Sequence, residues 1–129
     1  MGDGVQQFED LEVWQLARRQ VVAIYRLFES EAAQRDFGLK GQVTRAAVSV
    51  MSNVAEGFER LNIKEKGHFY NIARASNGEV RSLLYVVGDV YPGQAEAAHS
   101  AQQITVKIGK LISGLIRSTS QRLSAQDQS

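Results

Sequence analysis

The sequence predicts an all-α protein, folded as an antiparallel up-down-up-down four-helix bundle. Apolar residues recur at steps of three and four through four separate stretches, which is typical of amphipathic helices. Only one proline, Pro92, occurs in 129 residues, which favours long helices over irregular structure. Short links between the stretches make successive helices antiparallel neighbours. We expect one domain, residues 1–129, with helices over residues 10–30, 38–60, 63–91 and 94–120 and loose tails over residues 1–7 and 122–129.

The first predicted helix begins near Asp10, which we interpret as its N-cap, with Glu12 in the first turn. Its apolar seam alternates at steps of three and four, as in a coiled coil, through Trp14, Ala17, Val21, Ile24 and Phe28.

The second predicted helix is rich in small residues, which let neighbouring helices approach closely. Its polar residues Ser49, Asn53 and Glu56 follow one another at steps of four and three. Because buried polar groups need partners, we interpret this alignment as a buried or interfacial hydrogen-bonded strip.

The third predicted helix opens with Asn62 and Glu65, which have the spacing of a capping box. Residues 83–87 are apolar on all sides, which indicates a second contact surface outside the bundle core. Pro92 and Gly93 end this helix and form a turn. The fourth helix carries its seam on Ile104, Ile108, Leu111 and Leu115.

The run QVTRAAVSVMSNVAEGFER, followed by FYNIARAS and Glu79, resembles the bacterial four-helix-bundle family encoded in 23S rRNA intervening sequences. The opening FEDLEVWQLA is also similar, so the resemblance covers residues 8–116. It implies a protomer that assembles into a homo-oligomer, a pentamer, without catalytic activity. It also implies a relation to the accessory protein of diversity-generating retroelements, which is associated with nucleic acid and a reverse transcriptase. This chain departs from the family's usual pattern at Ala75 and at Asn77-Gly78.

The composition excludes several classes of protein. The chain has no cysteine, which excludes disulfides and thiolate metal sites and suits a reducing cytoplasm. The beginning of the sequence lacks the pattern of a signal peptide, and no apolar run approaches the ~20 residues that span a bilayer. We therefore expect a cytoplasmic protein without membrane contact. A formal net charge of +1 does not by itself indicate a nucleic-acid partner.

Two Glu-x-x-His pairs, Glu65 with His68 and Glu96 with His99, raise the remote alternative of a di-iron bundle enzyme. Both pairs lie at the beginnings of antiparallel helices, so roughly 35 Å of helix would separate them. The sequence also lacks the common catalytic and phosphate-loop motifs. We expect no catalytic residues, no cofactor and no metal.

The favoured function is non-enzymatic binding of RNA or DNA, with basic patches repeated around a ring. Phosphate contacts require only clustered lysines and arginines. A solvated helix face explains the same charges, and a protein-interaction or scaffold subunit is the alternative function. The candidate nucleic-acid-binding residues are Lys40, Arg45, Lys64, Lys66, Lys107, Lys110, Arg117 and Arg122.

A second set of residues is interpreted as structural. We expect a hydrogen-bonded network that fixes helix register or subunit pairing, in which Glu56 approaches Arg74 or an arginine of a neighbouring subunit. The members of this network are Asn53, Glu56, Arg74, Ser76 and Glu79.

Overall fold

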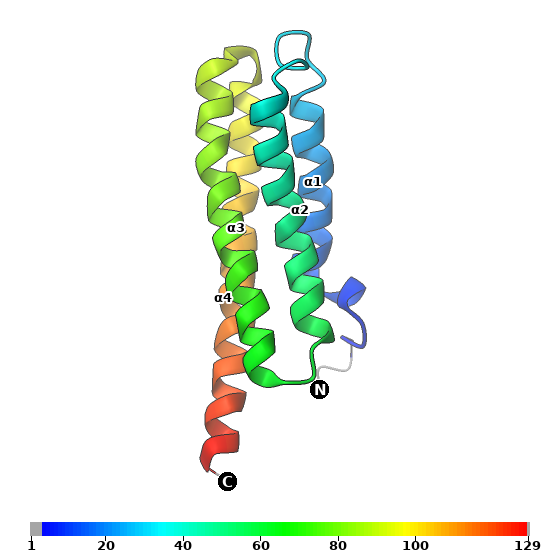
Figure 1. The fold of residues 1–129 in the computed structure, drawn as a ribbon, viewed down its shortest axis with the longest axis vertical. Helices are drawn as coiled ribbons and strands as arrows, with labels where there is room; N and C mark the ends of the chain where they lie inside the picture. The colour runs from blue at the N-terminus through cyan, green and yellow to red at the C-terminus, as the bar shows by residue number, and fades with distance from the viewer. Residues whose placement is uncertain (1–3, 129) are drawn as a thin grey trace.

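The computed structural model describes the backbone of residues 4–128 and consists of four long helices packed side by side (Figure 1). Consecutive helices run in opposite directions along the bundle in this view. The described residues contain no strand and no helix that is long and apolar enough to cross a membrane. The elements are η1 (Phe8–Asp10), α1 (Glu12–Leu27), α2 (Phe37–Glu59), α3 (Ile63–Val90), η2 (Pro92–Gln94) and α4 (Ala95–Gln128).

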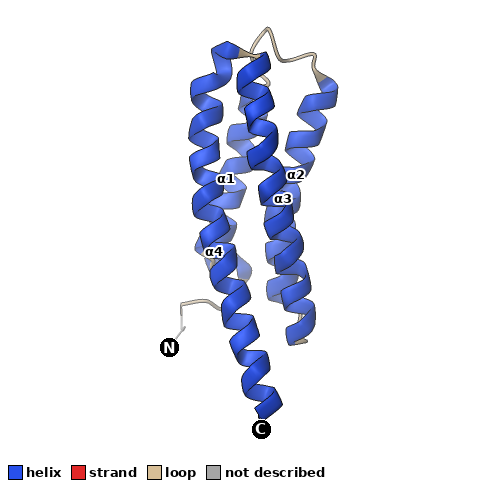
Figure 2. Ribbon diagram, turned by 90° about the vertical axis from the view of Figure 1, so that its left-hand side faces the viewer, coloured by secondary structure: helices blue, strands red, loops and turns tan. Residues whose placement is uncertain are grey.

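The helix α4 is longer than predicted. It continues to Gln128, through most of the segment that we expected to be a loose tail, and extends past the other helices at one end (Figures 1 and 2). Residues after Gly114 include no further glycine or proline, and Gln121, Arg122, Leu123 and Ala125 all favour helix. Of the two predicted tails, residues 1–3 and Ser129 lie outside the described residues.

The prediction that Asp10 caps the first helix is wrong. Leu11 is the N-cap of α1, and it makes no side-chain capping bond. Asp10 ends the short helix η1, where its carboxylate accepts the backbone N–H groups of Gln6 and Gln7. The acidic residue thus organises the turn before α1 rather than α1 itself.

The beginnings of α2 and α3 are capped by side chains. The Asp36 carboxylate accepts the N–H of Leu39 at 3.2 Å, and Asn62 accepts the N–H of Glu65 at 3.1 Å, as predicted for Asn62. The Tyr91 hydroxyl donates to the second oxygen of Asp36 at 2.6 Å. One carboxylate therefore caps α2 and joins it to the end of α3.

A close approach joins the end of α2 to the beginning of α3. A Cβ atom on Gly57 would lie 2.5 Å from Cε1 and 2.7 Å from Cδ1 of Tyr70. The Tyr70 ring is 4% exposed, so it cannot move aside into solvent. Only glycine fits at position 57 with this ring in place.

Buried carboxamides set the position of α4 along the bundle. Gln20 of α1 donates to the carbonyl of Ala101 at 2.7 Å, and Asn77 of α3 donates to the carbonyl of Thr105 at 2.8 Å. A third bond runs in the opposite direction, because Gln102 of α4 donates to the carbonyl of Arg81 on α3 at 3.3 Å. A shift of α4 by one residue would break these bonds and leave buried polar groups without partners.

We predict that Gly57→Ala destabilises the protein. Overpacking against Tyr70 costs about 1–3 kcal/mol, whereas the gain in helix propensity is about 1 kcal/mol. The measurement is urea denaturation, with Gly38→Ala as the control because a Cβ there meets nothing within 4 Å. A gain in stability from Gly57→Ala as large as that from Gly38→Ala would contradict the close approach.

We predict that Tyr91→Phe reduces the dependence of stability on acid pH. The Tyr91 hydroxyl, and after it the Leu39 N–H, hold the pKa of Asp36 below its ordinary value of 3.8. A lowered carboxyl pKa contributes stability above the unfolded-state pKa, and this stability is lost as pH falls through the folded-state pKa. Melting temperatures should therefore fall less in Tyr91→Phe than in the wild type between pH values of about 7 and 2.5. An equal fall in both proteins would refute the assignment.

Candidate functional site

A groove runs between α3 and α4 along the outside of the bundle. It has a volume of about 640 Å³, and the residues between its cations include the small residues Gly78, Gly109 and Ser113 and one aliphatic side chain, Val106. We call it the α3/α4 groove. Its lining residues are Arg74, Asn77, Gly78 and Arg81 from α3, and Thr105, Val106, Gly109, Lys110, Ser113 and Arg117 from α4.

The charged residues of the α3/α4 groove are all cations. Arg74 and Arg81 come from α3, Lys110 and Arg117 come from α4, and all four side chains are exposed. Each pair is separated by seven residues, so its members lie on one helix face about 10.5 Å apart. No carboxylate lines the groove, and none of its cations forms an ion pair with another described residue. The groove therefore concentrates positive charge on two facing helices.

The floor of the groove depends on the packing of Asn77. This carboxamide is buried and donates to the Thr105 carbonyl, and a Cβ on Gly109 would lie 3.3 Å from its nitrogen. A Cβ on Gly78 would meet nothing within 4 Å. The absence of a side chain at Gly109 therefore leaves room for Asn77, whereas Gly78 borders open space.

The predicted basic residues do not form one surface. Lys110 and Arg117 line the α3/α4 groove, as described above. Lys107 does not line the groove, because its side chain extends towards α1, with its amino group 3.7 Å from the Glu12 carboxylate. Three residues advance a helix by about 300°, so Lys107 and Lys110 point only about 60° apart around α4. That difference is enough for Lys107 to reach α1 while Lys110 lines the groove.

Lys66 has a structural role. Its amino group donates to the carbonyl oxygens of Gly57 at 3.2 Å and Phe58 at 2.7 Å, which closes the last turn of α2. Burial, and then the positive charge of Arg122, lower the pKa of Lys66, whereas Glu59 acts in the opposite direction. Lys66 and Arg122 thus belong to the end of the bundle where α2 meets α3.

The remaining predicted cations lie elsewhere. Lys64 is exposed in the first turn of α3. Lys40 lies 5.9 Å from the centroid of the Tyr25 ring, and Arg45 lines a shallow hollow between α1 and α2 beside the same tyrosine. None of these three residues lines the α3/α4 groove.

The predicted polar network is present only in part. The hydroxyls of Ser49 and Ser76 hydrogen bond at 2.8 Å across α2 and α3, and Asn53 donates to the Ser49 hydroxyl at 3.0 Å. The expected pairing of Glu56 with Arg74 within the protomer is wrong, because Glu56 pairs with Arg60 at 2.9 Å.

The reason is the register of α2 against α3. Ser49 is level with Ser76, and Gly57 is level with Tyr70, so Glu56 lies about one helical turn from the level of Arg74. Arg74 lines the α3/α4 groove instead, and Glu79 is exposed outside that groove.

Arg81 and the buried carboxamides of Gln20 and Asn77 were not among the residues predicted from the sequence. The signal for Arg81 was its seven-residue spacing from Arg74, with Asn77 and Gly78 between them on α3. No comparable signal marked the carboxamides, because their partners are backbone carbonyls of α4.

The two Glu-x-x-His pairs lie far apart in the fold. Glu65 and His68 lie at the beginning of α3, and Glu96 and His99 lie at the beginning of α4, which are at opposite ends of the bundle (Figure 1). Among the side chains that the structure describes, in residues 4–125, no group of three or more histidines and carboxylates could hold a metal ion.

We predict that alanine substitutions of two glycines of the groove differ in stability. Gly78→Ala should raise the free energy of unfolding by up to about 1 kcal/mol, because its methyl group enters open space. Gly109→Ala should be less stable than Gly78→Ala, because its methyl group presses on Asn77, which its hydrogen bond holds in place. Urea denaturation measures both. Equal stabilisation by the two substitutions would contradict the packing of the floor.

The chain is similar to known proteins in sequence and in fold. A family model described as "23S rRNA-intervening sequence protein" matches residues 9–114. A crystal structure of a protein of unknown function from the S23 ribosomal protein family of Bacteroides thetaiotaomicron is similar in fold, with a TM-score of 0.72. The two chains are 21% identical, and the match covers 81% of this chain and 97% of that one.

None of the curated proteins matches the chain. The relation to the retroelement accessory protein stays a prediction. The family match spans most of the sequence, including the stretches on which the predicted resemblance was based. The protein therefore belongs to the 23S rRNA-intervening sequence protein family.

Proposed function

We propose that this protein is a non-enzymatic nucleic-acid-binding protein that holds phosphate groups of RNA or DNA in the α3/α4 groove. The observation that carries the proposal is the arrangement of Arg74, Arg81, Lys110 and Arg117, which face outward around a floor of small residues without a lining carboxylate.

The chemistry of the groove suits a phosphate backbone. Guanidinium groups bind phosphate oxygens in a bidentate manner, and a lysine adds a point charge. The residues between the cations include Gly78, Gly109 and Ser113, which are small. Little side-chain volume therefore separates the cations from an approaching phosphate backbone. None of the lining residues is aromatic, so base stacking has no platform there. The groove therefore supports binding through phosphates, which carries no direct information about base sequence.

We also propose that the protomer functions as a homo-oligomer, a pentamer as the family resemblance implies. Exposed apolar residues on α3 support the proposal: Tyr85, Val86 and Val90 are 59%, 41% and 54% exposed. Burying them against another copy would be favourable, and a ring would repeat the groove and strengthen its field. The same residues support the second candidate, a protein-interaction or scaffold subunit. Pull-down from lysate with and without nuclease separates the two candidates.

We predict that neutralising two lysines on α4 has different effects on nucleic-acid binding. Fluorescence anisotropy with duplex RNA and duplex DNA over a salt series should give a logarithm of affinity that falls linearly with log salt. Lys110→Gln should reduce the slope by about 0.9, because one phosphate contact is lost. Lys107→Gln is the matched control, since it removes the same charge from the side of α4 that contacts Glu12.

Two outcomes would contradict the proposal. Absence of binding at low salt would exclude the nucleic-acid function and leave the protein-interaction candidate. An equal loss in Lys107→Gln and Lys110→Gln would mean that net charge, and not the α3/α4 groove, is responsible for binding.

A further inference from the structure

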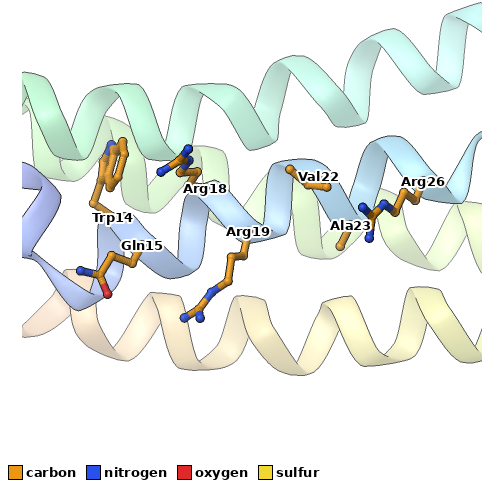
Figure 3. Close-up of a pocket in the computed structure, with 7 residues that line it drawn as sticks. All are labelled: Trp14, Gln15, Arg18, Arg19, Val22, Ala23 and Arg26. Carbon is orange, nitrogen blue, oxygen red and sulfur yellow. The ribbon is translucent and has the colours of Figure 1, made fainter.

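The helix α1 has an outward face that no other helix covers. Two rows of side chains run along it at steps of four residues and enclose a hollow of about 550 Å³ (Figure 3). We call it the α1 face. One row consists of Trp14, Arg18, Val22 and Arg26, and the other of Gln15, Arg19 and Ala23.

The floor of the α1 face is apolar. Val22 is 47% exposed, Ala23 beside it is also exposed, and the half-buried Trp14 closes one end. The Arg18 guanidinium lies 5.6 Å from the centroid of the Trp14 ring, in a cation–π contact. This chemistry differs from the α3/α4 groove, whose lining contains glycines, polar side chains and a single aliphatic side chain, Val106.

Among the residues that the structure describes, every charged side chain that lines the α1 face is an arginine, and none is a carboxylate. Figure 3 shows Arg18 reaching towards α2 and Arg19 towards α4, so cations flank the apolar floor on both sides. Arg26 adds a third cation two turns of helix beyond Arg18. The face therefore complements a ligand that has an apolar centre and negative edges.

We propose that the α1 face binds an amphipathic helix of a partner protein, apolar along one side and acidic along its edges. Such a helix can lay one ridge of side chains into the groove between the two rows of α1. Its apolar residues would cover Val22, Ala23 and Trp14, and its carboxylates would meet the arginines in charge-assisted hydrogen bonds. A phosphate backbone has no apolar surface to bury on this floor. The partner function is additional to nucleic-acid binding and independent of it.

The chain carries its own reporter for this site, because Trp14 is its only tryptophan. The probe is a synthetic amphipathic helical peptide with leucines at steps of three and four, glutamates along both edges, and no aromatic residue. We expect saturable change in Trp14 emission at micromolar peptide. A scrambled peptide of the same composition, which has the charge without the apolar side, should bind at least about tenfold more weakly.

Substitutions on the exposed surface test the two parts of the site separately. Arg19→Glu with Arg26→Glu should weaken peptide binding by more than about tenfold, because attraction becomes repulsion. Val22→Ser keeps the charge and should also weaken binding, because the apolar floor is lost. Arg35→Glu is the control, since Arg35 is exposed in the connection between α1 and α2 and does not line the site.

Four results would overturn the proposal. The scrambled peptide could bind equally well, or Arg35→Glu could weaken binding as much as the double substitution. Duplex DNA could change Trp14 emission and compete with the peptide, which would assign the face to nucleic acid. The double substitution could reduce the mass of the protein in light scattering, which would mean that a second copy covers the face.

Discussion

Buried hydrogen bonds from α1 and α3 determine the position of α4 along the bundle. The carboxamides of Gln20 and Asn77 donate to carbonyl oxygens of Ala101 and Thr105, which lie one turn apart on α4. Since a buried polar group without a partner is costly, these bonds select one register of α4 against α1 and α3. That register places Lys110 and Arg117 on the side of α4 that faces the Arg74 and Arg81 row of α3. The α3/α4 groove is thus a consequence of the buried bonds.

The two candidate binding surfaces have similar charge and different floors. Arginines and a lysine surround a floor of glycine, serine and buried amide in the α3/α4 groove. Arginines surround Trp14, Val22 and Ala23 on the α1 face. Positive charge alone attracts any polyanion, but an apolar floor gains from a ligand that buries it, whereas a low polar floor admits a phosphate backbone. We therefore assign the phosphate backbone to the α3/α4 groove and the amphipathic helix to the α1 face.

The sequence predicted what depends on local pattern. Apolar periodicity identified the four helices, Asn62 was identified as a cap, and Pro92 was identified as the end of α3. The density of lysine and arginine near the end of the chain singled out Lys110 and Arg117. Other features depend on the register between helices. These are the role of Lys66, the partner of Glu56 and the position of Arg81 in the groove. Backbone carbonyls and one close glycine contact set that register, and no local pattern encodes them.

Lysine footprinting would show whether nucleic acid occupies the α3/α4 groove. All the lysines of the chain, Lys40, Lys64, Lys66, Lys107 and Lys110, belong to the predicted basic set, and only Lys110 lines the α3/α4 groove. Mass spectrometry would compare their acetylation with and without duplex DNA at low salt. Binding in the groove should protect Lys110 and leave the reactivity of Lys40, Lys64 and Lys107 unchanged. Protection of those lysines while Lys110 stays reactive would contradict it.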